Sequence, residues 1–239
     1  MKTVGIILKN YNKDGNSSIL GVREYLIKYL RNFNVLVVCI PFAFSNRLEL
    51  EINKPLIDKC DGIILPGGRG SHELDYKIVE YLYQINKPTL GLCLGMQLME
   101  KTFNGHITKP IENHRTGKEY SHKITINKNT LLFKILKEEE IEVNSLHSFA
   151  IPNTSLDVSA ISNDGVIEAI EDKTKTFFLG VQWHPEILDD IYSKRLFDYA
   201  KSSSSFPDNL ELSCTAARCR IWIALSSSPT FQKCSAIFR

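Results

Sequence analysis

Three residue types in two short segments have the chemistry of a nucleophile and its base. Cys93 lies in "GLCLG", between Gly91 and Gly95, whereas His184 and Glu186 lie in "GVQWHPE". A thiolate can attack a carbonyl carbon, an imidazole can take up and return the proton, and a carboxylate can fix the tautomer of the imidazole. We therefore interpret Cys93, His184 and Glu186 as a candidate catalytic triad.

The residues around Cys93 predict a sharp turn between a strand and a helix. "PTLGL" is a short apolar run typical of a buried strand, and "LGMQLMEKTF" has apolar residues at helical spacing. The flanking glycines let strand and helix approach and leave the thiol exposed, and the start of a helix favours the thiolate. The alternative is a buried, inert cysteine, which is how we interpret Cys39 and Cys60.

The position of His184 favours catalysis over the structural role that a single histidine more often has. It follows a predicted strand and precedes Pro185, which restrains the backbone. In an open α/β sheet, residues beyond the carboxyl ends of the strands gather at one crevice. We therefore expect Cys93, His184 and the loop containing Gly67 and Gly68 to converge.

Alternating strands and helices from residue 2 to about 200 predict an α/β fold. We expect a flavodoxin-like open, mostly parallel sheet with helices on both faces. Shorter alternating segments after residue 105 predict a small antiparallel extension. The expected helices include 17–33 with a serine cap, 72–85, and 189–201 with Asp189 or Asp190 near its start.

Composition excludes several classes of function. The 239 residues hold 29 Lys and Arg against 27 Asp and Glu, so no basic surface indicates nucleic acid binding. No apolar run is long enough for a membrane span and no signal peptide is recognisable, so we expect a cytoplasmic protein with no membrane partner. The six cysteines form no C-x-x-C pair, which argues against a zinc site.

The chain divides into a predicted catalytic domain, residues 1–201, and a non-core tail, residues 202–239. The tail is serine-rich and lacks sustained periodicity. We interpret it as sequence foreign to the native protein, and a partner-binding tail is the alternative.

Three motifs, "LPGG", "GLCLGMQ" and "GVQWHPE", resemble in order and spacing the class I glutamine amidotransferase-like superfamily, including the peptidase C26 branch of gamma-glutamyl hydrolases. The resemblance covers residues 1 to about 200. Three further segments, "HRTGKEYSHKI", "VNSLHSFAI" and "SNDGVIEAI", are most similar to gamma-glutamyl-gamma-aminobutyrate hydrolases. The resemblance implies the superfamily's version of the α/β fold.

The resemblance also implies residue roles. Cys93 would attack a gamma-glutamyl amide and form a glutamyl thioester, while His184 protonates the leaving amine and then activates water, oriented by Glu186. Backbone N–H groups of Gly68 and Leu94 would form the oxyanion hole. The implied substrate-binding residues are Gly67, Gln97, His147, Ser148 and Phe149.

Gln97 lies one helical turn after Cys93 and so can face the same pocket. His147 is equally well explained as a polar loop residue, and we interpret His114 and His122 as structural. The resemblance requires no metal and no organic cofactor.

Three functions remain open. The first is a stand-alone hydrolase of small gamma-glutamyl amides, favoured by "HRTGKEYSHK" and "VNSLHS". The second is a glutaminase that passes ammonia to a synthetase partner, and Leu94 and Phe149 are closer to that group. The third is a non-catalytic binding module, against which the complete set of Cys, His and Glu argues.

Overall fold

The computed structural model describes residues 1–12, 18–43, 47–104 and 109–203. The predicted tail, residues 202–239, lies almost entirely outside these ranges, so its assignment stays a prediction. Within the described ranges, no helix has both the length and the apolar character needed to cross a membrane.

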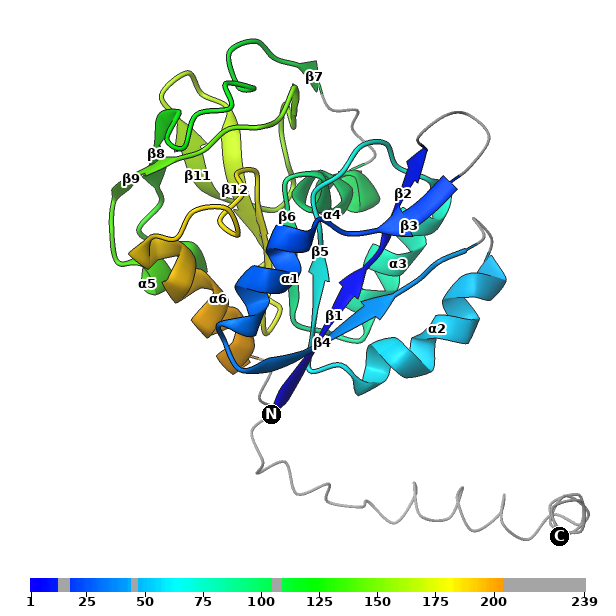
Figure 1. Ribbon diagram of the computed structural model, residues 1–239. Helices are drawn as coiled ribbons and strands as arrows, with labels where there is room; N and C mark the ends of the chain where they lie inside the picture. The colour runs from blue at the N-terminus through cyan, green and yellow to red at the C-terminus, as the bar shows by residue number, and fades with distance from the viewer. Residues whose placement is uncertain (13–17, 44–46, 105–108, 204–239) are drawn as a thin grey trace, which may run out of the picture. The chain divides into compact units, whose positions relative to one another are not determined.

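A nine-stranded sheet with the order β4-β1-β5-β6-β13-β12-β11-β8-β9 organises the described chain (Figure 1). Neighbours from β4 to β13 pair in parallel, and those from β13 to β9 pair antiparallel. The predicted mostly parallel sheet with an antiparallel extension is therefore confirmed. In sheet order the strands are Val35–Ile40, Lys2–Ile7, Gly62–Leu65, Thr89–Leu92, Phe178–Val181, Ile167–Glu171, Asp157–Ser162, His122–Ile126 and Glu140–Val143.

Helices cover both faces of the sheet (Figure 1). Apolar residues of α1 (Glu24–Arg31), α5 (Leu131–Leu136) and α6 (Ile191–Ser203) pack in one core cluster, and those of α2 (Arg47–Lys59), α3 (Glu73–Gln84) and α4 (Leu94–Asn104) pack in the other. In α1 the buried residues Leu26, Tyr29 and Leu30 follow the three- and four-residue spacing of one helix face.

The helix predicted for residues 17–33 is wrong in its first part. Ser18–Gly21 forms strand β3, which pairs with β2 (Lys9–Asn12), and helix α1 begins only at Glu24. The predicted serine cap is also wrong, because Arg23 precedes the helix and provides no side-chain cap. Backbone groups of β3 find their partners across the hairpin and so do not need a helix.

The predicted start of the last helix is confirmed at Asp190, whose Oδ1 accepts the Ser193 N–H at 2.7 Å. The interpretation of Cys39 as a buried cysteine is wrong. Cys39 is exposed because β4 is the outer strand of the sheet, whereas Cys60 is buried as expected.

Candidate active site

Cys93 occupies a tight turn between β6, which ends at Leu92, and α4, which begins at Leu94. Its φ angle is 51°, a left-handed conformation that non-glycine residues adopt only where the surroundings enforce it. The Cys93 N–H donates to Val181 O at 2.8 Å, and Cys93 O accepts the Gln97 N–H at 3.2 Å. These bonds to the neighbouring strand and to the helix fix the predicted turn.

The two glycines beside Cys93 are required by close packing. A Cβ atom on Gly91 would lie 2.7 Å from Met99 Sδ and 2.8 Å from the carbonyl carbon of Gly95. A Cβ atom on Gly95 would overlap the carbonyl oxygen of Leu65 at the end of β5. Strand β6, helix α4 and strand β5 can therefore meet only where these positions carry no side chain.

His184 and Glu186 form a directional pair after β13. His184 Nδ1 lies 2.8 Å from Glu186 Oε1, and both residues are buried. Asn144, which sequence reasoning missed, accepts the His184 N–H and donates to His184 O, each at 2.8 Å. The backbone of His184 is thereby fixed by a side chain from the segment after β9.

Gly67 brings the loop, the imidazole and the thiol together. A Cβ atom on Gly67 would lie 2.7 Å from His184 Cε1 and 3.6 Å from Cys93 Cβ. The loop after β5, the turn after β6 and the segment after β13 thus converge beyond the carboxyl ends of three adjacent parallel strands, as the sequence predicts.

Charge in this cluster stabilises an imidazolium. Burial alone would lower the pKa of His184, but the Glu186 carboxylate and the hydrogen-bonded Cys93 sulfur outweigh burial and raise it to about 10. Burial, together with the charge of Glu186, raises the pKa of Tyr25 to about 12, so its hydroxyl stays neutral. At neutral pH, His184 therefore holds a proton that it can donate.

The residues predicted for an oxyanion hole lie against each other. Leu94 is the first residue of α4, where helix N–H groups lack acceptors within the helix. A Cβ atom on Gly68 would lie 3.3 Å from Leu94 Cδ2 and 3.5 Å from Lys9 Cγ. Lys9 Nζ lies 2.6 Å from Asp75 Oδ1, and this largely buried ion pair packs beside the loop.

Two of the predicted substrate-binding residues, Gln97 and His147, meet at the backbone carbonyl of a third, Phe149. Gln97 Nε2 donates to Phe149 O at 3.1 Å and to Gln182 Oε1 at 3.0 Å. His147 Nδ1 lies 3.0 Å from the same Phe149 carbonyl oxygen. Both amide hydrogens of Gln97 are thus engaged within the protein, which leaves its Oε1 as the group for a ligand. Ser148 is partly exposed next to them.

His147 also belongs to a second group of ionisable side chains. With His114 and His122, it surrounds Glu168, which lies on β12 and is fully buried. Glu168 was not among the predicted site residues. The available signal was a carboxylate inside the apolar strand "VIEAI".

Several known proteins are similar to this chain in sequence or in fold. Residues 69–186 match the Peptidase C26 family. NtpR of Enterococcus hirae is 31% identical over 179 residues, which cover 60% of this chain and 74% of that protein. The CTP synthase of Borreliella afzelii is 25% identical over 230 residues, which cover 80% of this chain and 42% of that protein.

Among solved structures, the glutaminase domain of Trypanosoma brucei CTPS with bound acivicin has a similar fold, with a TM-score of 0.66 at 17% identity. The match covers 86% of this chain and 96% of that chain.

This chain belongs to the class I glutamine amidotransferase-like superfamily, as its motifs suggest. The enzyme class that these relatives support is a hydrolase acting on carbon–nitrogen bonds. The chain spans less than half the length of the CTP synthases that it matches, 42% in one case and 33% in another.

Proposed function

We propose that the chain is a cytoplasmic, cysteine-dependent hydrolase of small gamma-glutamyl amides that releases glutamate and an amine. The observation that carries this proposal is the packing of Gly67 against both the His184 ring and Cys93, with Glu186 Oε1 2.8 Å from His184 Nδ1. This arrangement supplies a nucleophile, a proton donor and a group that orients the donor.

In the first half of the reaction, the Cys93 thiolate attacks the side-chain carbonyl carbon of the substrate. A carbon–sulfur bond forms, and the carbonyl oxygen becomes an oxyanion that the N–H groups of Leu94 and Gly68 stabilise. Each such donor contributes about 3 kcal/mol to the transition state. The carbon–nitrogen bond then breaks as His184 donates its proton to the leaving nitrogen.

In the second half, neutral His184 takes a proton from water, whose oxygen attacks the glutamyl thioester. The carbon–sulfur bond breaks, glutamate leaves, and the thiolate of Cys93 is restored. Glu186 stabilises the imidazolium that forms in this half reaction. The net change is one amide and one water converted to glutamate and an amine.

Recognition of the glutamyl group is assigned to the neighbourhood of the Phe149 carbonyl. Because both amide hydrogens of Gln97 bond to Phe149 and Gln182, its Oε1 is suited to accept from the substrate's ammonium group. Gly67, Ser148 and His147 complete the proposed binding set. The carbonyl of Phe149 holds this part of the site in register with α4.

A second candidate is a glutaminase that supplies ammonia to a synthetase partner. Two observations favour it: the match to CTP synthases, and Leu94 directly after the nucleophile. The chemistry at Cys93 would be the same, with ammonia as the leaving group. The two candidates differ in the leaving group and in dependence on a partner.

The test measures glutamate release by the full chain from glutamine and from a panel of gamma-glutamyl amines that includes gamma-glutamyl-gamma-aminobutyrate. Cys93→Ala is the inactive variant, and Cys39→Ala, which removes an exposed thiol on the outer strand, is the matched control.

Turnover of a capped amine well above that of glutamine, lost only in Cys93→Ala, supports the hydrolase. Activity restricted to glutamine, or appearing only with a synthetase, supports the second candidate. Equal activity of Cys93→Ala and wild type would overturn both.

A further inference from the structure

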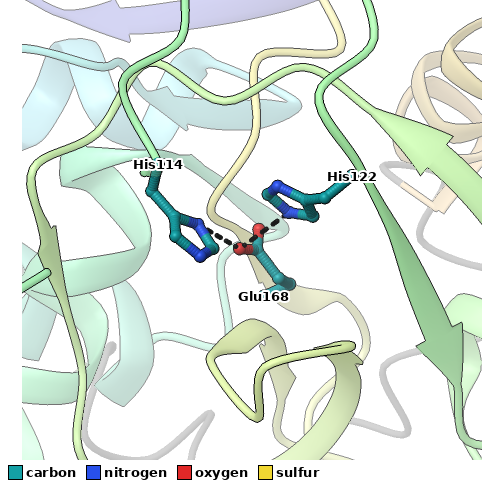
Figure 2. A group of neighbouring side chains, drawn as sticks. All are labelled: His114, His122 and Glu168. Carbon is teal, nitrogen blue, oxygen red and sulfur yellow. Dashed lines mark ion pairs between the residues drawn. The ribbon is translucent and has the colours of Figure 1, made fainter. Parts of the chain in front are cut away.

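Three ionisable side chains from separate segments, His114, His122 and Glu168, converge on one point (Figure 2), and His147 lies against two of them. Glu168 Oε1 lies 3.4 Å from His114 Nδ1, 3.2 Å from His122 Nε2 and 3.5 Å from His147 Nε2. A bridge between Arg115 and Leu146 holds the segments of His114 and His147 side by side. We call these four residues the histidine cluster.

The contacts of Glu168 are not ordinary hydrogen bonds. Among the described residues, the two carboxylate oxygens of Glu168 have no partner in hydrogen-bond geometry. The same is true of His122 Nε2. Glu168 is 0% exposed. A buried carboxylate without directional partners is costly, and native proteins rarely retain one without a compensating group.

Each of two histidine rings has an inner nitrogen, which faces Glu168, and an outer nitrogen, which faces another acceptor. The partner of the outer nitrogen indicates whether the inner nitrogen carries a lone pair. His114 Nε2 lies 2.9 Å from Asp164 Oδ2, and His147 Nδ1 lies 3.0 Å from Phe149 O. Both acceptors require an N–H on the outer nitrogen. The neutral rings then direct two lone pairs at each other across 3.3 Å, from His114 Nδ1 and His147 Nε2.

A cation bound to His114 Nδ1 removes this repulsion, because it takes up one of the two lone pairs. Histidines that bind metals usually donate their other ring N–H to a carboxylate or a backbone carbonyl, and Asp164 is such an acceptor for His114. A second proton on one imidazole is the competing explanation. The two explanations predict different metal contents.

We propose that His114, His122 and Glu168 bind a zinc ion, with a water molecule as the fourth ligand. Tetrahedral zinc with bonds of about 2.0–2.1 Å separates its ligand atoms by about 3.3–3.4 Å. Glu168 Oε1 lies 3.4 Å from His114 Nδ1 and 3.2 Å from His122 Nε2, close to this separation. The ligand atoms of the three residues all lie within 4.8 Å of one another.

Three protein ligands leave one position of a tetrahedral sphere for water. The ion would join β8, β12 and the segment of His114. The expectation of no zinc site rested on the lack of C-x-x-C pairs, whereas the ligands of this cluster are histidines and a carboxylate.

The first test uses the full wild-type chain, stripped of metal by a chelator and titrated with Co²⁺. The expected result is one equivalent of four-coordinate Co²⁺, visible by its d–d absorption, without a thiolate-to-cobalt charge-transfer band. The absence of that band separates this site from one at Cys93. Absent binding, six-coordinate Co²⁺, or a thiolate band alone would overturn the proposal.

The second test measures zinc affinity in variants whose circular dichroism matches the wild type. His122→Ala and Glu168→Gln should lose stoichiometric zinc. Asp164→Asn, an exposed side chain that acts through His114, should weaken zinc binding about 10- to 100-fold. Asp157→Asn removes a similarly exposed carboxylate that pairs with Lys173 and should bind as the wild type does. Wild-type affinity in both His122→Ala and Asp164→Asn contradicts the proposal.

Discussion

The catalytic residues and the histidine cluster both combine imidazoles with a carboxylate, but they do so differently. His184 and Glu186 form one directional contact of 2.8 Å between residues two positions apart. Glu168 instead faces three imidazoles at 3.2–3.5 Å without directional bonds. One directional pair is suited to moving a proton, whereas several lone pairs aimed at a common point are suited to holding a cation.

The largest expected effect is on the rate of glutamate release, and it separates the catalytic residues from the histidine cluster. Cys93→Ala removes the nucleophile and should lower the rate of glutamate release by roughly 10⁴-fold or more. Its zinc content should equal that of the wild type, because Cys93 is not a proposed ligand. Glutamate release and elemental analysis on the same preparations check this prediction. Loss of zinc together with activity would show that the two groups are not separate.

Removal of metal tests the histidine cluster by stability. Zinc at a free concentration 1,000 times its dissociation constant should raise the free energy of unfolding by about 4 kcal/mol. The gain should persist in Cys93→Ala and vanish in Glu168→Gln. Denaturant unfolding with zinc and with a chelator measures it. An equal gain in Glu168→Gln would place the binding elsewhere.

The pH dependence of stability tests the proton on His184. Its folded pKa of about 10 exceeds the ordinary value of 6.5, so the stabilisation is complete below pH 6.5 and is lost as pH rises toward 10. Across this window, one proton changes the unfolding free energy by at most about 1.4 kcal/mol per pH unit.

Glu186→Gln removes the charge that raises the His184 pKa, so it should flatten this slope. Glu80→Gln, an exposed carboxylate paired with Lys77, should not. Urea unfolding at several pH values between 7 and 9.5 measures both slopes. Equal slopes in Glu186→Gln and wild type would contradict the assignment.

The smallest expected effect concerns the support of His184. Asn144→Ala removes two hydrogen bonds to the His184 backbone and should lower kcat about 10-fold with KM nearly unchanged. Asn53→Ala removes a buried amide that bonds to Pro41 O and Glu49 O in another part of the fold. It should reduce stability comparably without changing kcat. Steady-state kinetics and urea unfolding distinguish the two variants.

The predictable part of the site depends on short-range spacing. The two glycines around Cys93 and the carboxylate two residues after His184 can be read directly from the sequence. Asn144 and Glu168 could not be found this way, because the fold brings them to their partners from distant segments. Ser18–Gly21 was assigned to a helix for a similar reason, since its strand exists only through pairing with β2.

The Phe149 carbonyl has a consequence for how this chain can change during evolution. Its oxygen accepts from Gln97 on the side of the nucleophile and from His147 on the side of the histidine cluster. A substitution that alters the path of this backbone would change the geometry of the catalytic site and of the histidine cluster together. Mutations at the two groups should therefore show epistasis, and new leaving-group specificity should arise first at positions that leave residues 147–149 in place.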